Sequence, residues 1–376
     1  MTTGRYLRHT LIDWFDQDAV RAERVVVVGA GAVGNEVIKN LALLGIGRID
    51  VFDLDHVEEH NLTRSVLFRE TDVGRAKAQC AAERASDLDP NIEIQAHVGD
   101  FWDTLSFDLL GATSGVFSCL DSFEARIRLN RLCALLSVDL VNTGVDSRFA
   151  VVETYPFRSQ PAGACYECSL PSSAYTAIAQ RYSCARLRRV ALEERKVPTT
   201  ILTSSACASA AVSAHLHRGR TLDAPGSRRL LLDTFTGAAT RCSLPRQPEC
   251  PGCGDLDAPR RAARARRRIA PELLPGGTVN GTTVFTSEPI LVRAGCRACD
   301  LAGRTSSWLV LQPAARFDET FASCPCCGEA RELEIRDHFS ANDLVARFSG
   351  CSMPGKFVTC RIQGTLAVIE LEDDDG

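Results

Sequence analysis

A run of four valines that leads into a glycine-rich turn constrains the fold of this chain more than any other feature. The run Arg24–Val28 is followed by the turn Gly29-Ala30-Gly31-Ala32-Val33-Gly34. Apolar residues then recur at helical spacing over residues 35–44, and a second apolar run follows over residues 48–54. This order of strand, glycine turn, helix and strand predicts a βαβ unit, and hence a doubly wound sheet of the α/β class.

The glycines and acidic residues of this unit suit a nucleotide. Gly29 permits the tight turn, Gly31 removes a side chain that would block a phosphate, and Gly34 lets the helix pack closely on the strand. Asp53 and Asp55 end the second strand, where an acidic group usually binds ribose hydroxyls. Alone, this motif fits a nicotinamide dehydrogenase as well as an ATP site.

Two cations that follow the second strand favour ATP. The segments Asn61-Leu62-Thr63-Arg64 and Val73-Gly74-Arg75-Ala76-Lys77 are predicted to send Arg64 and Lys77 toward the pocket. A dehydrogenase must leave a neutral nicotinamide free for hydride transfer, whereas cations suit a triphosphate. A nicotinamide oxidoreductase therefore ranks last among the functions that we consider.

A carboxylate at the end of a further apolar run completes the expected crevice. Residues 115–120 predict a strand that delivers Asp121 to the edge of the sheet where ligands of open α/β folds bind. Asp121 could hold Mg²⁺ on the phosphates. The alternative is that Asp121 only caps the following helix, and we favour the metal role.

Charge and cysteine content narrow the class of protein. A net charge of -4 argues against a nucleic-acid binder, and no apolar run is long enough to span a membrane. The N-terminus lacks the pattern of a secretory signal, so we expect the cytosol. There, 17 cysteines favour thiols or metal ligands over disulfides, and four Cys-x-x-Cys pairs predict two tetrathiolate zinc sites: Cys165/Cys168, Cys250/Cys253, Cys296/Cys299 and Cys324/Cys327.

The second half of the chain changes character after Gly254. Residues 256–277 are rich in arginine, proline and glycine, which predicts a linker or an exposed helix. Residues 278–376 should form a separate β-rich domain in which Cys296/Cys299 and Cys324/Cys327 have the layout of a zinc ribbon. Recruitment of a protein partner is its most economical role. Its β-prone runs cover residues 282–286, 290–293, 307–312, 357–362 and 366–371.

Taken in order, these motifs resemble those of the ThiF/MoeB/HesA adenylyltransferases, which are related to ubiquitin-activating enzymes. The resemblance runs from Arg5 to Gly254. It includes Arg5-Tyr6-Leu7-Arg8-His9, the glycine turn, Asp53-Leu54-Asp55, Asn61-Leu62-Thr63-Arg64, residues 74–77, Cys119-Leu120-Asp121-Ser122, Asn142-Thr143-Gly144, Cys165-Tyr166-Glu167-Cys168 and Cys250-Pro251-Gly252-Cys253-Gly254. It implies a Rossmann-like doubly wound sheet of the ubiquitin-activating type over residues 1–255.

The resemblance also implies roles for single residues. Asp53 looks like the ribose ligand, Asn61 and Arg64 like phosphate contacts, Lys77 like the lysine between phosphates and Asp121 like the magnesium ligand. Arg8 matches an arginine that crosses a dimer interface in this family, which implies a homodimer. The first two cysteine pairs match one structural zinc site. The family often has Asn where this chain has Ser122, so a contact made by that amide is not carried over.

Cys184 is the remaining candidate. In position it resembles a loop cysteine that receives the acyl group as a thioester in several relatives, and nearby arginines would favour its thiolate. An ordinary loop thiol is the equal alternative, because some relatives stop at the acyl-adenylate.

The resemblance predicts ATP-dependent activation of the C-terminal carboxylate of a ubiquitin-like or sulfur-carrier protein, with Mg²⁺ and two structural Zn²⁺ ions. A downstream thiol acceptor protein would follow. The alternatives are an enzyme that adenylates a short peptide, as in antibiotic synthesis, and a non-catalytic nucleotide-binding scaffold. The presence of Arg8, Arg64, Lys77 and Asp121 argues against the scaffold.

Overall fold

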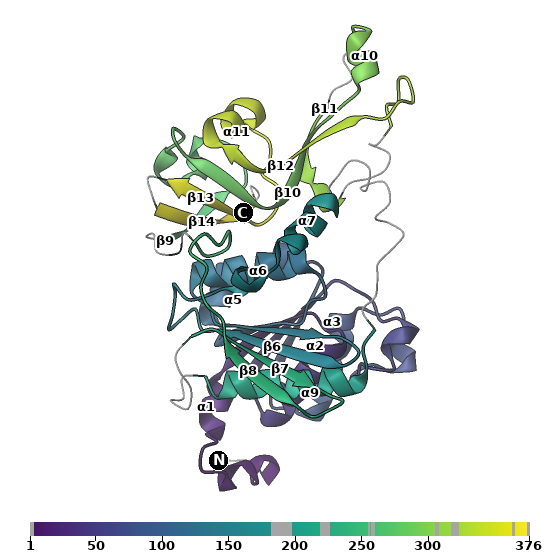
Figure 1. Cartoon of the computed structure of the whole chain (residues 1–376), viewed down its shortest axis with the longest axis vertical. Coiled ribbons are helices and arrows are strands. Elements are labelled where there is room, and N and C mark those ends of the chain that lie inside the picture. Colours follow the sequence, from purple (N-terminus) through teal and green to yellow (C-terminus); the bar gives the residue numbers. More distant parts are fainter. Residues whose placement is uncertain are drawn as a thin grey trace. The chain divides into compact units, whose positions relative to one another are not determined.

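The chain forms two compact units in a computed structural model (Figure 1). The first unit comprises Met1–Ser169 and Val197–Gly254, and the second comprises Leu170–Lys196 and Asp255–Gly376. Within them, the structure describes residues 4–181, 198–218, 226–254, 256, 260–304, 308–316, 323–362 and 365–373.

The first unit is built on an eight-stranded sheet with the order β3-β2-β1-β4-β5-β6-β7-β8. The strands are β1 (Arg24–Val28), β2 (Arg48–Asp53), β3 (Glu93–Val98), β4 (Gly115–Ser118), β5 (Leu140–Val145), β6 (Phe149–Tyr155), β7 (Arg228–Asp233) and β8 (Ala239–Ser243). Strands β1 to β5 pair in parallel, and β6 to β8 extend the sheet antiparallel. The order 3-2-1-4-5 confirms the predicted doubly wound fold.

Helices cover both faces of this sheet, with α5 and α6 on the side opposite α2 and α9 (Figure 1). One core joins alternate residues of the central strands to α2, α3 and α9, as expected for strands that are buried on both faces. Small buried residues of α9, such as Cys207 and Ala211, allow close packing. The helices are α1 (Gln17–Ala22), α2 (Ala32–Leu44), α3 (Lys77–Leu88), α4 (Phe101–Thr104), α5 (Phe107–Ala112), α6 (Phe123–Leu136) and α9 (Ile201–Leu216).

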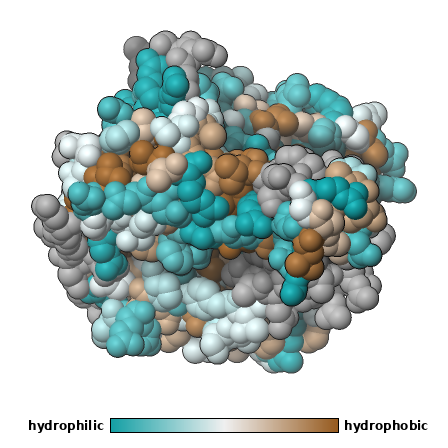
Figure 2. Space-filling view, turned by 90° about the horizontal axis from the view of Figure 1, so that it is seen from above, coloured by the Kyte–Doolittle hydropathy of each residue, from teal (hydrophilic) through white to brown (hydrophobic). Residues whose placement is uncertain are grey.

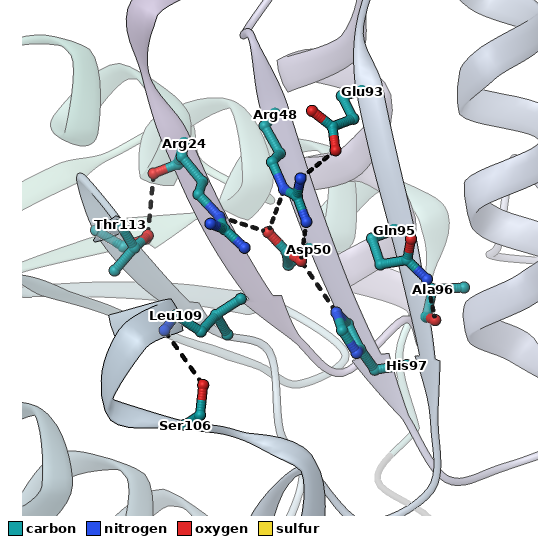
Figure 3. A network of polar contacts seen from close by, with 11 residues as sticks. Arg24, Arg48, Asp50, Glu93, Gln95, Ala96, His97, Ser106, Leu109 and Thr113 are labelled. Atoms are coloured by element: carbon teal, nitrogen blue, oxygen red, sulfur yellow. Dashed lines mark hydrogen bonds and ion pairs between the residues drawn. The ribbon is translucent and has the colours of Figure 1, made fainter. Parts of the chain in front are cut away.

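A charged cluster centred on Asp50 ties β1, β2 and β3 together (Figure 3). The fully buried Asp50 carboxylate accepts from Arg24 Nε at 2.9 Å and from Arg48 Nε at 3.1 Å, and it lies 3.0 Å from His97 Nε2. Burial would raise the pKa of Asp50, but the bonds from His97, Arg48 and Arg24 outweigh it and hold the pKa well below its usual range. The cluster therefore stabilises the sheet through the ionised carboxylate.

We expect Asp50→Asn to destabilise the first unit by about 3 kcal/mol, because two guanidinium groups lose their shared anion. The midpoint of thermal unfolding should fall by roughly 6–12 °C. The exposed pair of Asp87 with Arg84, at 3.4 Å, provides the control, and Asp87→Asn should change stability by less than about 0.5 kcal/mol.

The same cluster has a pH dependence with a definite sign. Because the pKa of Asp50 is lower in the folded chain than in the unfolded one, its stabilisation is present above the unfolded value and is lost as the pH falls through the folded value. The deficit of Asp50→Asn should shrink in acid. A deficit that is constant down to the acid transition would contradict this account.

The second unit contains a six-stranded sheet with the order β11-β10-β13-β14-β9, and β12 pairs with β10 beside this path. Its described strands are β9 (Arg260–Arg266), β10 (Thr283–Gly295), β11 (Trp308–Pro313), β12 (Glu332–Ser340), β13 (Phe357–Ile362) and β14 (Thr365–Glu372), and its described helices are α7 (Ser172–Arg181), α10 (Arg297–Leu301) and α11 (Ala341–Phe348). Its core joins β10, β13 and β14 to α11.

Every β-prone run that we predicted in this unit overlaps a strand, and the first two runs belong to the single strand β10. Strand β12 and helix α11 were not predicted. Residues 260–266, which we expected in a linker or an exposed helix, instead form β9, which pairs in parallel with β14. Ala263 and Ala265 pack against the core, and they alternate with the exposed Arg264 and Arg266. These two arginines therefore occupy the outer face of an edge strand.

Among the described residues, no helix has the length and apolar character needed to cross a membrane. The face of the molecule in Figure 2 carries separate hydrophobic patches that are interrupted by hydrophilic residues.

Candidate active site

The glycine turn lies between β1 and α2, at the carboxyl edge of the parallel strands. Gly29 has φ +96°, and a Cβ there would lie 2.5 Å from the Cys119 carbonyl oxygen. A Cβ on Gly34 would lie 1.8 Å from the Gly29 carbonyl oxygen. A Cβ on Gly31 would meet no atom within 4 Å, so open space lies in front of the α2 N-terminus. The turn is closely packed on one side and accessible to an anion on the other.

Asp53 supports the turn from the end of β2. Its carboxylate accepts from the Ala30 amide at 2.6 Å and from the Asp55 amide at 2.8 Å. Burial raises the pKa of Asp53, and these two backbone bonds offset only part of that increase. In this structure the carboxylate orders the glycine turn, and its role as a ribose ligand stays a prediction.

Lys77 begins α3 and is nearly buried, with 8% of its surface exposed. Its ammonium group lies 2.8 Å from the Asp55 carboxylate, and its amide donates to the Asp55 carbonyl at 2.9 Å. Asp55 has an exposed side chain, so it can leave the ammonium group when a phosphate competes for it. The structure therefore pairs two residues for which the sequence suggested separate ligands.

Asn61 and Arg64 lie at a short 3-10 turn, η3 (Glu59–Asn61). The Asn61 side chain accepts from the Glu58 amide at 2.9 Å, and Arg64 Nη1 donates to the His60 carbonyl at 2.6 Å. Both side chains thus fix their own turn in this structure. Their contacts with phosphate stay a prediction.

Asn35 connects this turn region to the glycine turn, and the sequence analysis missed it. It is fully buried, donates to the Ala30 carbonyl at 2.6 Å and accepts from the Leu67 amide at 2.9 Å. The local pattern offered little signal for it, because Asn35 stands beside another polar residue, Glu36, in the first turns of α2. Asn35 therefore holds the segment that contains Arg64 against the glycine turn.

Asp121 follows β4 and does not cap α6. The cap is Ser122, whose hydroxyl accepts from the Ala125 amide at 3.1 Å. Asp121 is exposed, and no hydrogen bond or ion pair joins its carboxylate to any residue that the structure describes. The alternative that we weighed, a purely structural capping role for Asp121, is therefore wrong. The carboxylate is available to a ligand at the same edge as the glycine turn.

Arg126 is a second residue that the sequence analysis did not select. It donates to the Asn142 side chain at 2.8 Å and also to the carbonyls of Thr143 and Leu120. These contacts join the ends of β4 and β5, and they fix the residue that precedes Asp121.

Arg8 lies at the other edge of the sheet. Its neighbour Tyr6 is buried and donates to Asp89, which ends α3, and a Cβ on Gly45 would lie 2.5 Å from the Tyr6 hydroxyl. Burial and the Asp89 carboxylate raise the pKa of Tyr6 to about 12, so the phenol stays neutral. Gly45 and the glycine turn are at opposite ends of α2, which is about 20 Å long. The structure therefore does not bring Arg8 to the glycine turn of its own chain.

Both predicted cysteine clusters are present. The four sulfurs of Cys165, Cys168, Cys250 and Cys253 lie within 4.8 Å of one another, and so do those of Cys296, Cys299, Cys324 and Cys327. A tetrad of thiolates fits a closed tetrahedral zinc site. The Gln247 amide also donates to Cys168 Sγ at 3.4 Å, as expected for a sulfur that carries negative charge.

The cysteines outside the two tetrads differ in their surroundings, and Cys242, Cys326 and Cys351 are exposed. Cys184 and the arginines around it lie outside the described residues, so both interpretations of Cys184 stay open. Burial raises the pKa of Cys119 to about 12, which makes this thiol inert although it lies beside the glycine turn. Cys80 and Cys133 are also buried.

Comparison with known proteins identifies the family. The model of the ThiF family matches residues 4–252, which is more than half of the chain. The chain belongs to the ThiF family. The match ends within the second cysteine pair of the first tetrad, and residues 253–376 lie outside it.

Two curated relatives cover most of this region. The chain is 30% identical over 242 residues to a sulfur carrier protein adenylyltransferase of Thermus thermophilus, covering 64% of this chain and 85% of that protein. It is 29% identical over 259 residues to a SAMP-activating enzyme E1 of Haloferax volcanii, covering 67% of this chain and 88% of that protein.

Solved structures agree on the fold. The E. coli MccB structure with ATP aligns with a TM-score of 0.52 and 24% identity, covering 68% of this chain and 75% of that chain. At this identity the likeness shows the shared fold alone.

The two central glycines lead to opposite predictions. Gly31→Ala should leave the thermal midpoint unchanged, because its Cβ enters open space, but should weaken ATP binding about tenfold or more by occupying the phosphate position. Gly34→Ala should prevent folding, because its Cβ overlaps the Gly29 carbonyl. Unchanged ATP affinity in Gly31→Ala, measured by calorimetry, would place the nucleotide elsewhere.

Proposed function

We propose that this chain uses ATP to adenylate the C-terminal carboxylate of a sulfur-carrier or ubiquitin-like protein. One observation carries the proposal: the open glycine turn, the Lys77 ammonium group and the Asp121 carboxylate, which pairs with no residue that the structure describes, occur together at the carboxyl edge of the parallel strands. The family and the names of the two relatives support this chemistry.

The charges of the site suit the reaction. A carboxylate oxygen of the carrier attacks the α-phosphorus of ATP, the bond between the α-phosphorus and the bridging oxygen breaks, and pyrophosphate leaves with the electron pair. The attacking group is already ionised at neutral pH, so no general base is needed. Lys77, Arg64 and the α2 amides neutralise the phosphates and hold them in line. Asp121 would hold Mg²⁺, which supplies further positive charge to the phosphates.

Exchange of labelled pyrophosphate into ATP tests this function. The wild-type chain should catalyse exchange only when a carrier protein with a free C-terminus is added, and Asp121→Asn should lower the rate by at least about 100-fold. Ser122→Ala is the control, because it removes the α6 cap at a cost of about 1 kcal/mol but leaves the carboxylate in place.

Two results of this assay would redirect the proposal. Pyrophosphate exchange that depends on a short peptide and not on a carrier protein would favour the peptide-adenylating alternative. Nucleotide binding without exchange for any carrier or peptide would indicate a scaffold.

We further propose that the active form is a homodimer in which Arg8 of one chain serves the site of the other. Two observations support this. Arg8 is exposed and lies about one helix length from its own glycine turn. Its neighbours Leu7 and Leu11 are apolar but have 64% and 78% of their surface exposed, as expected for residues that a second copy covers.

Mixing two inactive variants tests this arrangement. Arg8→Ala and Lys77→Ala should each be inactive alone, but a heterodimer of the two has one complete site. An equal mixture, refolded or exchanged, should recover up to about a quarter of the wild-type rate, since half of the dimers are mixed and each has one working site. No recovery, although gel filtration shows dimers, would contradict the shared site.

Each cysteine tetrad is proposed to hold one Zn²⁺ ion whose four positions are filled by sulfur, so both ions are structural. Elemental analysis should find two zinc ions per chain, and Cys326→Ser, which alters an exposed cysteine outside the tetrads, should retain both. One zinc ion or none would contradict the assignment.

The thiolate ligands favour a reducing compartment, so the cytosol stays our proposal. For the second unit we propose recruitment of a protein partner, which includes a thiol acceptor for the activated carrier. Deletion of residues 255–376 should then abolish transfer to that acceptor but preserve carrier-dependent exchange.

A further inference from the structure

A buried carboxylate lies beside the first cysteine tetrad. Glu167 stands between Cys165 and Cys168 in the sequence, and its side chain has no exposed surface. A Cβ added to Gly252 would lie 2.1 Å from Glu167 Oε1 and 3.2 Å from Cys165 Sγ. Glu167 therefore packs directly against the loop that contains the other cysteine pair.

The partners of this carboxylate come from α6. Arg131 binds it with two bonds, from Nε to Oε1 at 2.8 Å and from Nη2 to Oε2 at 2.7 Å. Asn130, fully buried beside Arg131, accepts from the Tyr166 amide at 2.9 Å. We call these three residues, Asn130, Arg131 and Glu167, the clasp. A bidentate arginine–carboxylate pair fixes orientation as well as distance, so the clasp sets the position of the middle of α6.

The N-terminal end of α6 lies beside the residues of the proposed site. Asp121 and Ser122 immediately precede the helix, and Arg126 from its second turn binds the Leu120 carbonyl and the end of β5. Ser122 and Arg131 are nine residues apart, which corresponds to about 14 Å along a rigid helix. The same helix is thus held near its middle by the cysteine loop that contains Glu167 and at its N-terminal end by the ends of β4 and β5.

We propose that the clasp is a positioning device that couples metal binding at the first tetrad to the placement of α6, and through it to Asp121. Side chains that hold the segments around a metal site orient the metal ligands, and their loss lowers metal affinity by roughly 10- to 100-fold. With the metal in place, the loop around Glu167 is ordered and the Arg131 fork holds the helix. Without the metal, the loop around Glu167 is no longer fixed by the cysteines, and the Arg131 guanidinium therefore loses a fixed carboxylate to bind. The inference rests on the proposed zinc site and nucleotide site.

The test uses the full-length zinc-loaded protein and two readouts that do not depend on catalysis. The first is the rate of zinc release to a coloured chelator, and the second is hydrogen exchange at the amides of residues 119–131. Arg131→Met and Glu167→Gln should each release zinc roughly tenfold faster than the wild type. Both should also increase exchange at residues 119–126 while zinc remains bound.

Asp233→Asn is the matched control, because Asp233 ends β7 and forms a similar two-bond pair with Arg148, which precedes β6 and does not belong to α6. Release of zinc from both clasp variants at the rate of this control would overturn the proposal. So would exchange at residues 119–126 that does not change when zinc is removed. Arg131 is 43% exposed on its side chain, so Arg131→Met should fold even if Glu167→Gln does not.

These outcomes separate the clasp from the proposed function. If the chain fails to exchange pyrophosphate with any carrier, but both readouts respond as expected, the proposed reaction fails and the coupling stands. If pyrophosphate exchange is normal and neither zinc release nor hydrogen exchange responds, the coupling fails and the proposed reaction stands.

Discussion

The close approach of three backbone segments, at Gly29, Gly34 and Cys119, is the constraint on which the site depends. The strand β1 must meet the start of α2 and the end of β4 without any intervening side chain, because a Cβ at Gly29 or Gly34 would overlap a carbonyl oxygen. This contact brings the α2 amides, the Asp53 carboxylate and the segment that leads to Asp121 to one edge. The chemistry of the crevice therefore follows from packing that excludes side chains.

Local pattern was sufficient to predict much of this. The valine run, the glycine turn and the acidic strand ends are short-range signals, and the structure confirms the sheet they implied. Asn35 and Arg126 could not be found in this way, because their roles exist only when strands and loops distant in sequence come together. Asp121 shows the same limit: the observed cap at Ser122 removes the capping interpretation, and the magnesium role stays a proposal.

The second unit shows where composition misleads. Six arginines in nine residues suggested a solvated linker, yet the small residues Ala263 and Ala265 alternate with arginine and let the segment join the sheet as β9. The cysteine pairs were more informative than composition, because their spacing fixes a geometry rather than a preference. Strand β12 pairs with β10, a partner distant in sequence, and its local pattern did not predict it.

The arm around Tyr6 has a consequence for how such a protein would respond to its own abundance. Tyr6 and Asp89 fix the N-terminal arm at the edge of the sheet opposite the glycine turn. Rotation of the Arg8 side chain therefore cannot bring it to the glycine turn of its own chain, about one helix length away. Under the proposed arrangement, a solitary chain would lack an arginine at its own glycine turn. Its turnover per molecule would rise with cellular concentration until pairing saturates, so expression level would act as a threshold for the proposed activity.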